Sequence, residues 1–219
     1  MPAFVLLPAS PSDLESIVRL QFKACADDQG FPVIFPKGAS LSSITHLVHS
    51  YENDMENDPT CFIMIVKEAM SGEIVSYAVW HFYPPRSQEE IDLEMLVENI
   101  PLPIDTNQEL GNRLIRESTR KRHEVVAATI GPQRAYAFLA ALGTSPRFQR
   151  QGAGSLLITW GLERADDRGL ATYVEASPGA LKLYENHGFH EASRLKLDMA
   201  PWKEGNYFNT CMVREPTTS

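Results

Sequence analysis

The sequence has few cysteines and no long hydrophobic run. Its three cysteines, Cys25, Cys61 and Cys211, lie far apart in 219 residues and are odd in number, so neither a disulfide framework nor a zinc cluster is indicated. No apolar stretch reaches the ~18 residues that a membrane-spanning helix needs. The first ten residues lack the basic start and apolar core of a secretory signal. We therefore expect a reduced cytoplasmic protein, which could also enter the nucleus, with no membrane partner and no metal.

Positive charge is scarce in the first half of the chain. The net charge is −8, which argues against nucleic acid as a partner. Residues 1–110 contain 5 Lys/Arg and 17 Asp/Glu, whereas residues 111–219 contain 15 and 11. We expect an anion on the C-terminal half and a cationic partner near the N-terminal half. The alternative is uneven surface charge that serves no partner.

Hydrophobic periodicity and turn residues predict one domain, 1–219, in which strands alternate with helices. We expect strands at 3–8, 61–67, 73–82, 136–142, 171–176, 189–199 and 207–213. Helices are expected around 14–22 and at 40–57, 107–126, 155–168 and 178–187, and the dense charge of the third is assigned mainly to a solvated face. The proline-rich insertion 84–106, with its acidic run 89–98, is either a short helix or a mobile segment.

The order of these elements predicts the fold class, a mixed α/β (α+β) single domain. A strand–helix–strand passage in the middle requires a locally parallel pair of strands, while the flanking hairpins are antiparallel. The sheet is therefore mixed and mostly antiparallel, with helices on both faces.

The segment Gln149–Ser155 (QRQGAGS) connects a predicted strand to a predicted helix. The first turn of a helix has unpaired backbone N–H groups and partial positive charge, which together bind phosphate. Gly152 and Gly154 lack β-carbons, so a phosphate can approach the backbone closely. Arg147 and Arg150 add positive charge. This pattern predicts a phosphate-binding loop.

Two familiar phosphate-binding loops do not fit. The loop of nucleotide triphosphatases needs a lysine after its last glycine, but Ser155 follows Gly154 directly. A dinucleotide-binding loop needs a third glycine where Leu157 stands, and it turns immediately after its strand, whereas ten residues separate Leu142 from Gly152. Glu175 stands where the ribose-binding acid of such a loop would lie, but these two departures argue against that interpretation.

The remaining pattern, Gln149-x-x-Gly152-x-Gly154, resembles the GCN5-related N-acetyltransferase (GNAT) family. The resemblance extends over 134–190, with YAFLAALGTSP before the loop and YVEASP and ALKLYENHGF after it. The stretch LLITWGLERADDRGLATYVEASPGALKLYENHGF is most similar to fungal members without an assigned substrate. The family implies an acetyl-CoA-dependent acyltransferase in which the central parallel strands splay apart around the acyl-pantetheine arm.

The resemblance also implies which residues would bind coenzyme A and which would act in catalysis. Tyr184, in LYENHGF, matches the tyrosine that commonly protonates the departing thiolate. Glu175 is the nearest candidate base, because the strand YAFLAAL contains no acid; His81 or a water chain could serve instead. The residues implied in coenzyme A binding are Leu142, Gly143 and Thr144 on the strand, Gln149, Arg150, Gln151, Gly152, Ala153, Gly154 and Ser155 in the loop, and Ser177, Ala180 and Leu183 on the far wall.

The acceptor is predicted only as a class. A primary amine would attack the thioester directly in a ternary complex, and the acidic N-terminal half favours a cationic small molecule or a lysine or peptide amine. The acidic insertion could close over this acceptor. The alternatives are an acyl-CoA-binding regulatory module with little turnover, and an O-acyltransferase on the same fold. Acyl chain length and oligomeric state are not indicated by the sequence.

Overall fold

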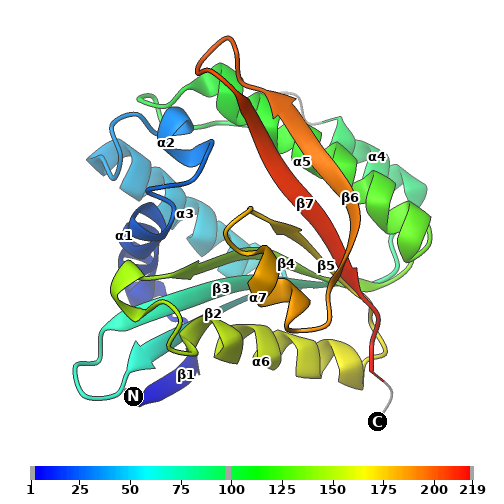
Figure 1. Ribbon diagram of the computed structural model, residues 1–219, viewed down its shortest axis with the longest axis horizontal. Helices are drawn as coiled ribbons and strands as arrows, with labels where there is room; N and C mark the ends of the chain where they lie inside the picture. Colours follow the sequence, from blue (N-terminus) through cyan, green and yellow to red (C-terminus); the bar gives the residue numbers. More distant parts are fainter. Residues whose placement is uncertain (1–2, 97–99, 218–219) are drawn as a thin grey trace.

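A computed structural model describes residues 3–96 and 100–217 (Figure 1). The strands are β1 (Phe4–Pro8), β2 (Cys61–Glu68), β3 (Ile74–Tyr83), β4 (Tyr136–Thr144), β5 (Thr172–Ala176), β6 (His190–Asp198) and β7 (Asn206–Arg214). The helices are α1 (Leu14–Ala24), α2 (Phe31–Ile34), α3 (Leu41–Asn57), α4 (Gln88–Met95), α5 (Gln108–Thr129), α6 (Ala153–Asp167) and α7 (Leu181–Glu185). Short 3₁₀ turns occupy Pro11–Asp13 and Pro146–Phe148.

Capping residues fix where several helices begin and end. The hydroxyl of Ser40 accepts from the Ser43 amide at 3.0 Å and starts α3, and Asn107 starts α5 in the same way. Such side chains satisfy amides that the first turn leaves unpaired. Gly169 follows the end of α6 with φ +62°, a left-handed conformation that glycine adopts at little cost. Ser40, Asn107 and Gly169 therefore set the start of α3, the start of α5 and the end of α6.

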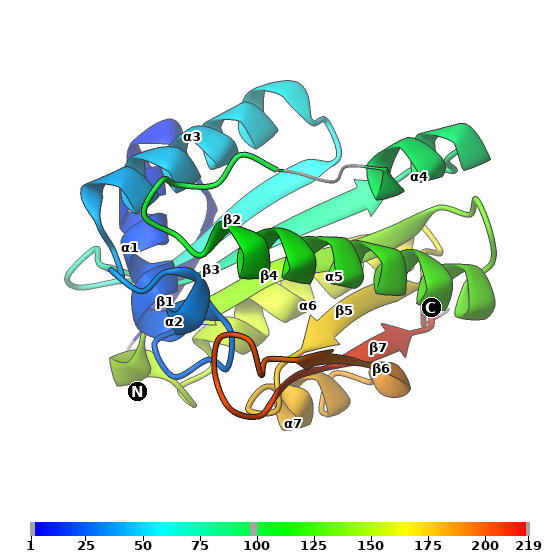
Figure 2. The ribbon, with the colours of Figure 1, turned by 90° about the horizontal axis from the view of Figure 1, so that it is seen from above.

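The seven strands form one sheet in the order β1-β2-β3-β4-β5-β7-β6. Every neighbouring pair is antiparallel except β4 and β5, which are parallel. Figure 2 shows α5 crossing the sheet, with α1 and α3 covering the other end of the same face. Helix α6 packs on the opposite face together with Tyr184 of α7. The predicted mixed sheet with helices on both faces is confirmed.

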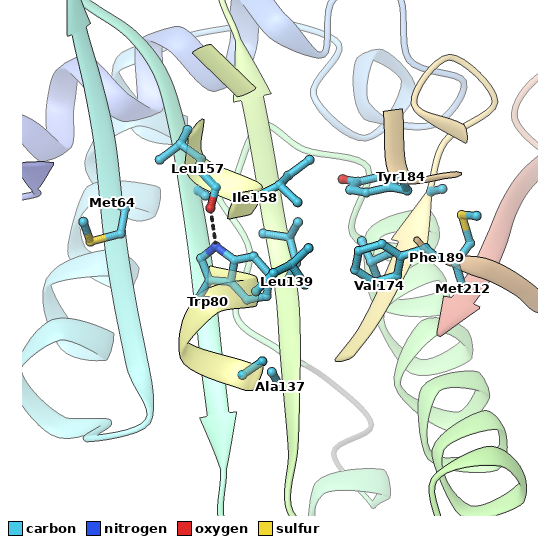
Figure 3. Packing of buried hydrophobic residues seen from close by; sticks show 14 of the residues in the cluster. Met64, Trp80, Ala137, Leu139, Leu157, Ile158, Val174, Tyr184, Phe189 and Met212 are labelled. Atoms are coloured by element: carbon cyan, nitrogen blue, oxygen red, sulfur yellow. Dashed lines mark hydrogen bonds between the residues drawn. The ribbon is translucent and has the colours of Figure 1, made fainter. Parts of the chain in front are cut away.

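The largest buried side chain of β3 positions α6. Trp80 is completely buried, and its indole N–H donates to the carbonyl of Leu157 at 3.3 Å (Figure 3). Its ring lies over Gly161, where a β-carbon would overlap the ring. The absence of a side chain at Gly161 therefore lets α6 lie flat on the sheet, which fixes where the start of this helix meets the end of β4.

The structure corrects two local expectations and decides between the alternatives for a third segment. Arg122 of α5 is buried rather than on a solvated face, because it forms an ion pair with Glu94 of α4. Strand β4 continues two residues beyond its predicted end at Leu142, since Thr144 pairs with Ser76. The insertion 84–106, expected as either a short helix or a mobile segment, contains the helix α4, and its residues 97–99 lie outside the described residues.

Candidate functional site: the opening between β4 and β5

The central parallel pair is joined over only three residues. Its register runs from Ala137↔Thr172 to Leu139↔Val174 and then stops. Beyond that point β4 pairs only with β3, and β5 pairs only with β7. The strands diverge there (Figure 3). One edge of each strand therefore carries backbone groups that no neighbouring strand satisfies, in the middle of the sheet.

A bulge in β4 coincides with this opening. Val79 pairs with Ala141 and Trp80 pairs with Leu139, so Ala140 is the extra residue. A bulge bends its strand and increases the local twist. Ala140 is exposed although it belongs to a central strand. The bulge thus turns the last part of β4 away from β5.

The loop at the end of β4 carries a run of free amides. Within the described chain, the N–H groups of residues 149–155 donate to no protein acceptor, whereas the flanking Phe148 and Leu156 amides donate to Ser145 and Gly152 carbonyls. Arg150 (φ +60°) and Gly152 (φ +97°) have left-handed conformations, and consecutive amides in such turns form a concave anion-binding surface. Seven free amides at the start of α6 fit the phosphate-binding interpretation.

Internal contacts hold this loop in place. The side-chain amide of Gln151 donates to the Arg147 carbonyl at 2.9 Å, and that of Gln149 donates more weakly to the Thr144 carbonyl at 3.5 Å. A β-carbon on Gly154 would lie 3.3 Å from the Thr144 hydroxyl and 4.0 Å from Leu183. The end of β4, the start of α6 and helix α7 therefore meet at one point.

The strand end is anchored from the β3 side. The hydroxyl of Ser76 lies 2.8 Å from the Gly143 carbonyl and 2.8 Å from the Thr144 hydroxyl. A β-carbon on Gly143 would overlap the ring of Tyr77, so the strand packs closely on that aromatic side chain. The structure places the residues predicted to hold the pantetheine arm, Leu142, Gly143 and Thr144, on the part of β4 that lacks a β5 partner.

The far-wall residues occupy the turn after β5. The Ala180 amide donates to the Ser177 carbonyl at 2.9 Å, which forms the turn into α7. Ala180 and Leu183 are partly buried and pack against the cluster that contains Tyr184 and α6. The structure thus brings Ser177, Ala180 and Leu183 to the β5 side of the opening.

Tyr184 points from α7 toward β4 (Figure 3). It is 4% exposed, and its ring packs edge-on against Phe189 at 5.7 Å. Burial raises the pKa of the hydroxyl well above its usual range, so the group is protonated at neutral pH. Among the described residues the hydroxyl has no hydrogen-bond partner. It is therefore a proton donor without an acceptor inside the protein.

Glu175 follows Val174, the last residue of β5 that pairs with β4, and its side chain faces α5. Its carboxylate accepts from the Tyr173 hydroxyl at 3.2 Å. Burial raises the pKa of this carboxyl group, while the charge of Arg122 and a hydrogen bond from Ser118 oppose the shift. A carboxylate with a raised pKa is a stronger base than an exposed one. Because side chains alternate along a strand, Glu175 and the buried core residue Val174 face opposite sides of the sheet.

His81, the other candidate base, is engaged elsewhere. Its Nδ1 atom lies 3.1 Å from an Asp58 carboxylate oxygen, and its ring stacks on Tyr83 at 5.3 Å. Burial lowers its pKa although Asp58 opposes the shift. Glu175 therefore lies beside the opening, whereas the imidazole of His81 is paired with Asp58.

Sequence reasoning missed the residues that surround Glu175. Asn209 and Tyr207 of β7 are hydrogen-bonded to each other at 2.7 Å, and hydrogen bonds from Asn209 and Ser118 lower the pKa of Glu175. The alternation of β7 could have placed Tyr207, Asn209 and Cys211 on one face. Ser118 and Arg122 of α5 are brought here only by the packing of that helix, and no sequence signal indicates it.

Comparison with known proteins agrees with this geometry. Residues 108–189 match the model of the acetyltransferase (GNAT) family. The segment includes β4, the loop, α6, β5 and α7. This match over part of the chain, together with the fold, confirms the predicted resemblance to the GNAT acetyltransferases.

Solved structures of similar fold span the whole chain. A histone acetyltransferase HPA2 and related acetyltransferase from Corynebacterium glutamicum is 22% identical, with a TM-score of 0.60 over 100% of this chain and 99% of that one. Arylalkylamine N-acetyltransferase 2 from Aedes aegypti is 12% identical, with a TM-score of 0.67 over 98% and 99%. The ribosomal-protein-S18-alanine N-acetyltransferase from Escherichia coli is 14% identical, with a TM-score of 0.56 over 99% and 96%.

Two kinds of feature are absent from the described residues. No helix in them has the length and apolarity that crossing a membrane requires. No group of three or more His, Cys, Asp or Glu side chains there could hold a metal ion. His46 and His49, one turn apart on α3, thus have no third ligand among the described residues.

Proposed function

We propose that the protein transfers an acetyl group from acetyl-CoA to a primary amine by direct attack in a ternary complex. The observation that carries this proposal is the break in β4–β5 pairing after Leu139 and Val174, directly beside the free amides of residues 149–155. A diphosphate on those amides would leave its pantetheine arm free to enter the opening. GNAT-type proteins use acetyl-CoA, which agrees with this assignment.

Each proposed residue has one task. The amides of residues 149–155 hold the pyrophosphate, and the unpaired edge of β4 at Leu142 and Thr144 binds the arm. The thioester supplies an activated acetyl group. Glu175 accepts the proton that the amine must lose when its nitrogen forms the new bond to the acetyl carbon. Tyr184 donates a proton to the sulfur when the carbon–sulfur bond breaks, because a protonated thiol leaves more readily than a thiolate.

The acceptor is proposed as a small cationic amine or a lysine or peptide amine. The acidic N-terminal half favours a positively charged acceptor electrostatically. Two of the similar structures are named for amine acceptors, an arylalkylamine and the alanine of a ribosomal protein, and both kinds are included in the test below. The resemblance to fungal members and closure of α4 over the acceptor stay predictions.

A thiol-release assay tests the proposal. Wild-type protein is incubated with acetyl-CoA and a panel of polyamines, arylalkylamines and lysine and N-terminal peptides, and free coenzyme A is measured. Gly152→Asp should raise the KM for acetyl-CoA at least about tenfold, because the new carboxylate repels the phosphates. Gly152→Asn is the matched control, since asparagine has nearly the same shape and the same left-handed strain without the charge.

The same assay separates the alternatives. If calorimetry detects acetyl-CoA binding but no acceptor releases thiol, the protein is better explained as an acyl-CoA-binding module. The absence of an acid in β4 supports this alternative. Thiol release with alcohols but not amines would favour an O-acyltransferase. If the protein showed no acetyl-CoA binding and no thiol release, that result would contradict the proposal.

A further inference from the structure

A separate cavity lies away from the opening between β4 and β5. A cavity of about 300 Å³ is enclosed by α4, the C-terminal half of α5 and the turn that precedes β4, where Figure 2 shows α4 beside the end of α5. Its apolar walls are Ile91, Met95, Val126, Ala127, Pro132 and the ring of Tyr136. None of the residues proposed for acyl transfer lines it. Its size is at the lower end of small-molecule pockets.

Among the described residues at the rim of this cavity, one cation has no carboxylate partner. Arg86 lies 2.7 Å from Glu94, and Arg120 lies 2.9 Å from Glu117. Glu124, the acid at the rim, lies 2.9 Å from Lys121. Arg134 is different, because within the described chain it forms no ion pair and only donates weakly to the Ile130 carbonyl at 3.3 Å.

The turn between α5 and β4 positions this arginine. Gly131 has φ +116°, and a β-carbon there would lie 2.9 Å from the Arg134 side chain. Gln133 also has a left-handed backbone, with φ +61°. The Arg134 side chain therefore folds over Gly131, at the mouth of the cavity, in a conformation that a larger residue at 131 would prevent.

A buried hydroxyl beside the cavity also lacks a partner. Tyr136 is 3% exposed, and its hydroxyl has no hydrogen bond in the part of the chain that the structure describes. Buried polar atoms of native proteins are nearly always hydrogen-bonded, to protein, water or a ligand. The neighbouring His123 has Nε2 engaged by Glu94 at 3.1 Å, so that nitrogen does not serve Tyr136.

We propose that this cavity binds a small carboxylate with an apolar body, such as a medium-chain or aryl-substituted acid. One unpaired guanidinium matches one negative charge, and Arg134 would hold the carboxylate by paired hydrogen bonds. The hydrocarbon walls exclude a strongly polar body, because its polar groups would lose water without replacement. Bound acid would also add contacts to α4, which has no buried residue of its own.

Calorimetric titration with octanoate and phenylbutyrate, without acetyl-CoA, tests the proposal. Wild-type protein should bind at least one of the two acids saturably. It should bind the neutral phenylbutyramide at least about tenfold more weakly than phenylbutyrate, and the Arg134→Gln variant should bind the acid at least about tenfold more weakly than the wild type does. Ala127→Phe should abolish binding by filling the cavity. Ala128→Phe is its matched control, because Ala128 is an exposed neighbour on α5 that does not line the cavity.

Two outcomes would overturn the proposal: no saturable binding of either acid to the wild type, or binding that Ala127→Phe leaves unchanged. Amide chemical-shift mapping on the wild-type protein locates the acid independently of any variant's folding. Shifts centred on Ile91 and Gly131 support the cavity, and shifts confined to residues 148–156 contradict it. Because no acyl transfer is measured, failure of the proposed acetyltransferase activity would not affect this result.

Discussion

Two carboxylates near one buried arginine have opposite environments. Glu94, between α4 and α5, contacts Arg86, Arg122 and His123, and these partners hold its pKa well below the usual range against the effect of burial. Glu175, at the β4–β5 opening, feels the same Arg122 charge, yet burial raises its pKa. The first region has its charges paired within the protein, and the second does not.

The difference extends beyond the two carboxylates. Within the described chain, the opening also contains seven amides without a protein acceptor and the Tyr184 hydroxyl without a partner, whereas α4 depends on the Glu94 ion pairs. Groups left unsatisfied inside a fold cost stability, and they are common where a ligand will satisfy them. We therefore expect substitutions at Glu94 to change mainly stability, and substitutions at the opening to change mainly activity.

The largest expected effect is on stability. Glu94→Gln should lower the free energy of unfolding by about 3 kcal/mol, because it leaves the Arg122 guanidinium, whose side chain is 7% exposed, without its carboxylate. The melting temperature should fall by roughly 6–12 °C for a domain of this size. Glu89→Gln, an exposed change on the same helix, is the control and should have little effect.

The pH dependence of this contribution has a definite sign. The folded pKa of Glu94 is depressed, so its contribution is complete above the unfolded value of about 4.3 and is lost as pH falls toward the folded pKa. Wild-type and Glu94→Gln proteins should therefore converge in stability under acid conditions. A constant difference between neutral and strongly acid pH would contradict the ion-pair explanation.

The next effect is on turnover. Tyr184→Phe should lower kcat on the order of a hundredfold through loss of the proton donor, with the KM for acetyl-CoA nearly unchanged. Stability should change little, since the hydroxyl makes no hydrogen bond within the described chain. Steady-state kinetics and thermal unfolding on the same preparation measure both. Unchanged kcat would remove Tyr184 from the mechanism.

The smallest effect concerns Glu175. Glu175→Gln should lower kcat by about tenfold, because water can take over part of the proton transfer. In the wild type, activity should rise with pH through the raised pKa of Glu175, as the carboxylate form becomes populated; the variant should lack this rise. The variant should also be more stable at neutral pH, because the raised pKa means that the buried charge opposes folding. Lower stability would contradict this comparison.

The sequence alone determined the element order, the glycine spacing of the loop 149–155 and the position of Tyr184 on a short helix, because periodicity, caps and glycine spacing are local properties. Only the tertiary structure decided that β4 and β5 separate after Leu139, and that Arg122 is buried between Glu94 and Glu175. Those facts depend on strand register, the bulge at Ala140 and the packing of α5. These contacts join residues that lie more than twenty-five positions apart in the sequence, and no local pattern encodes them.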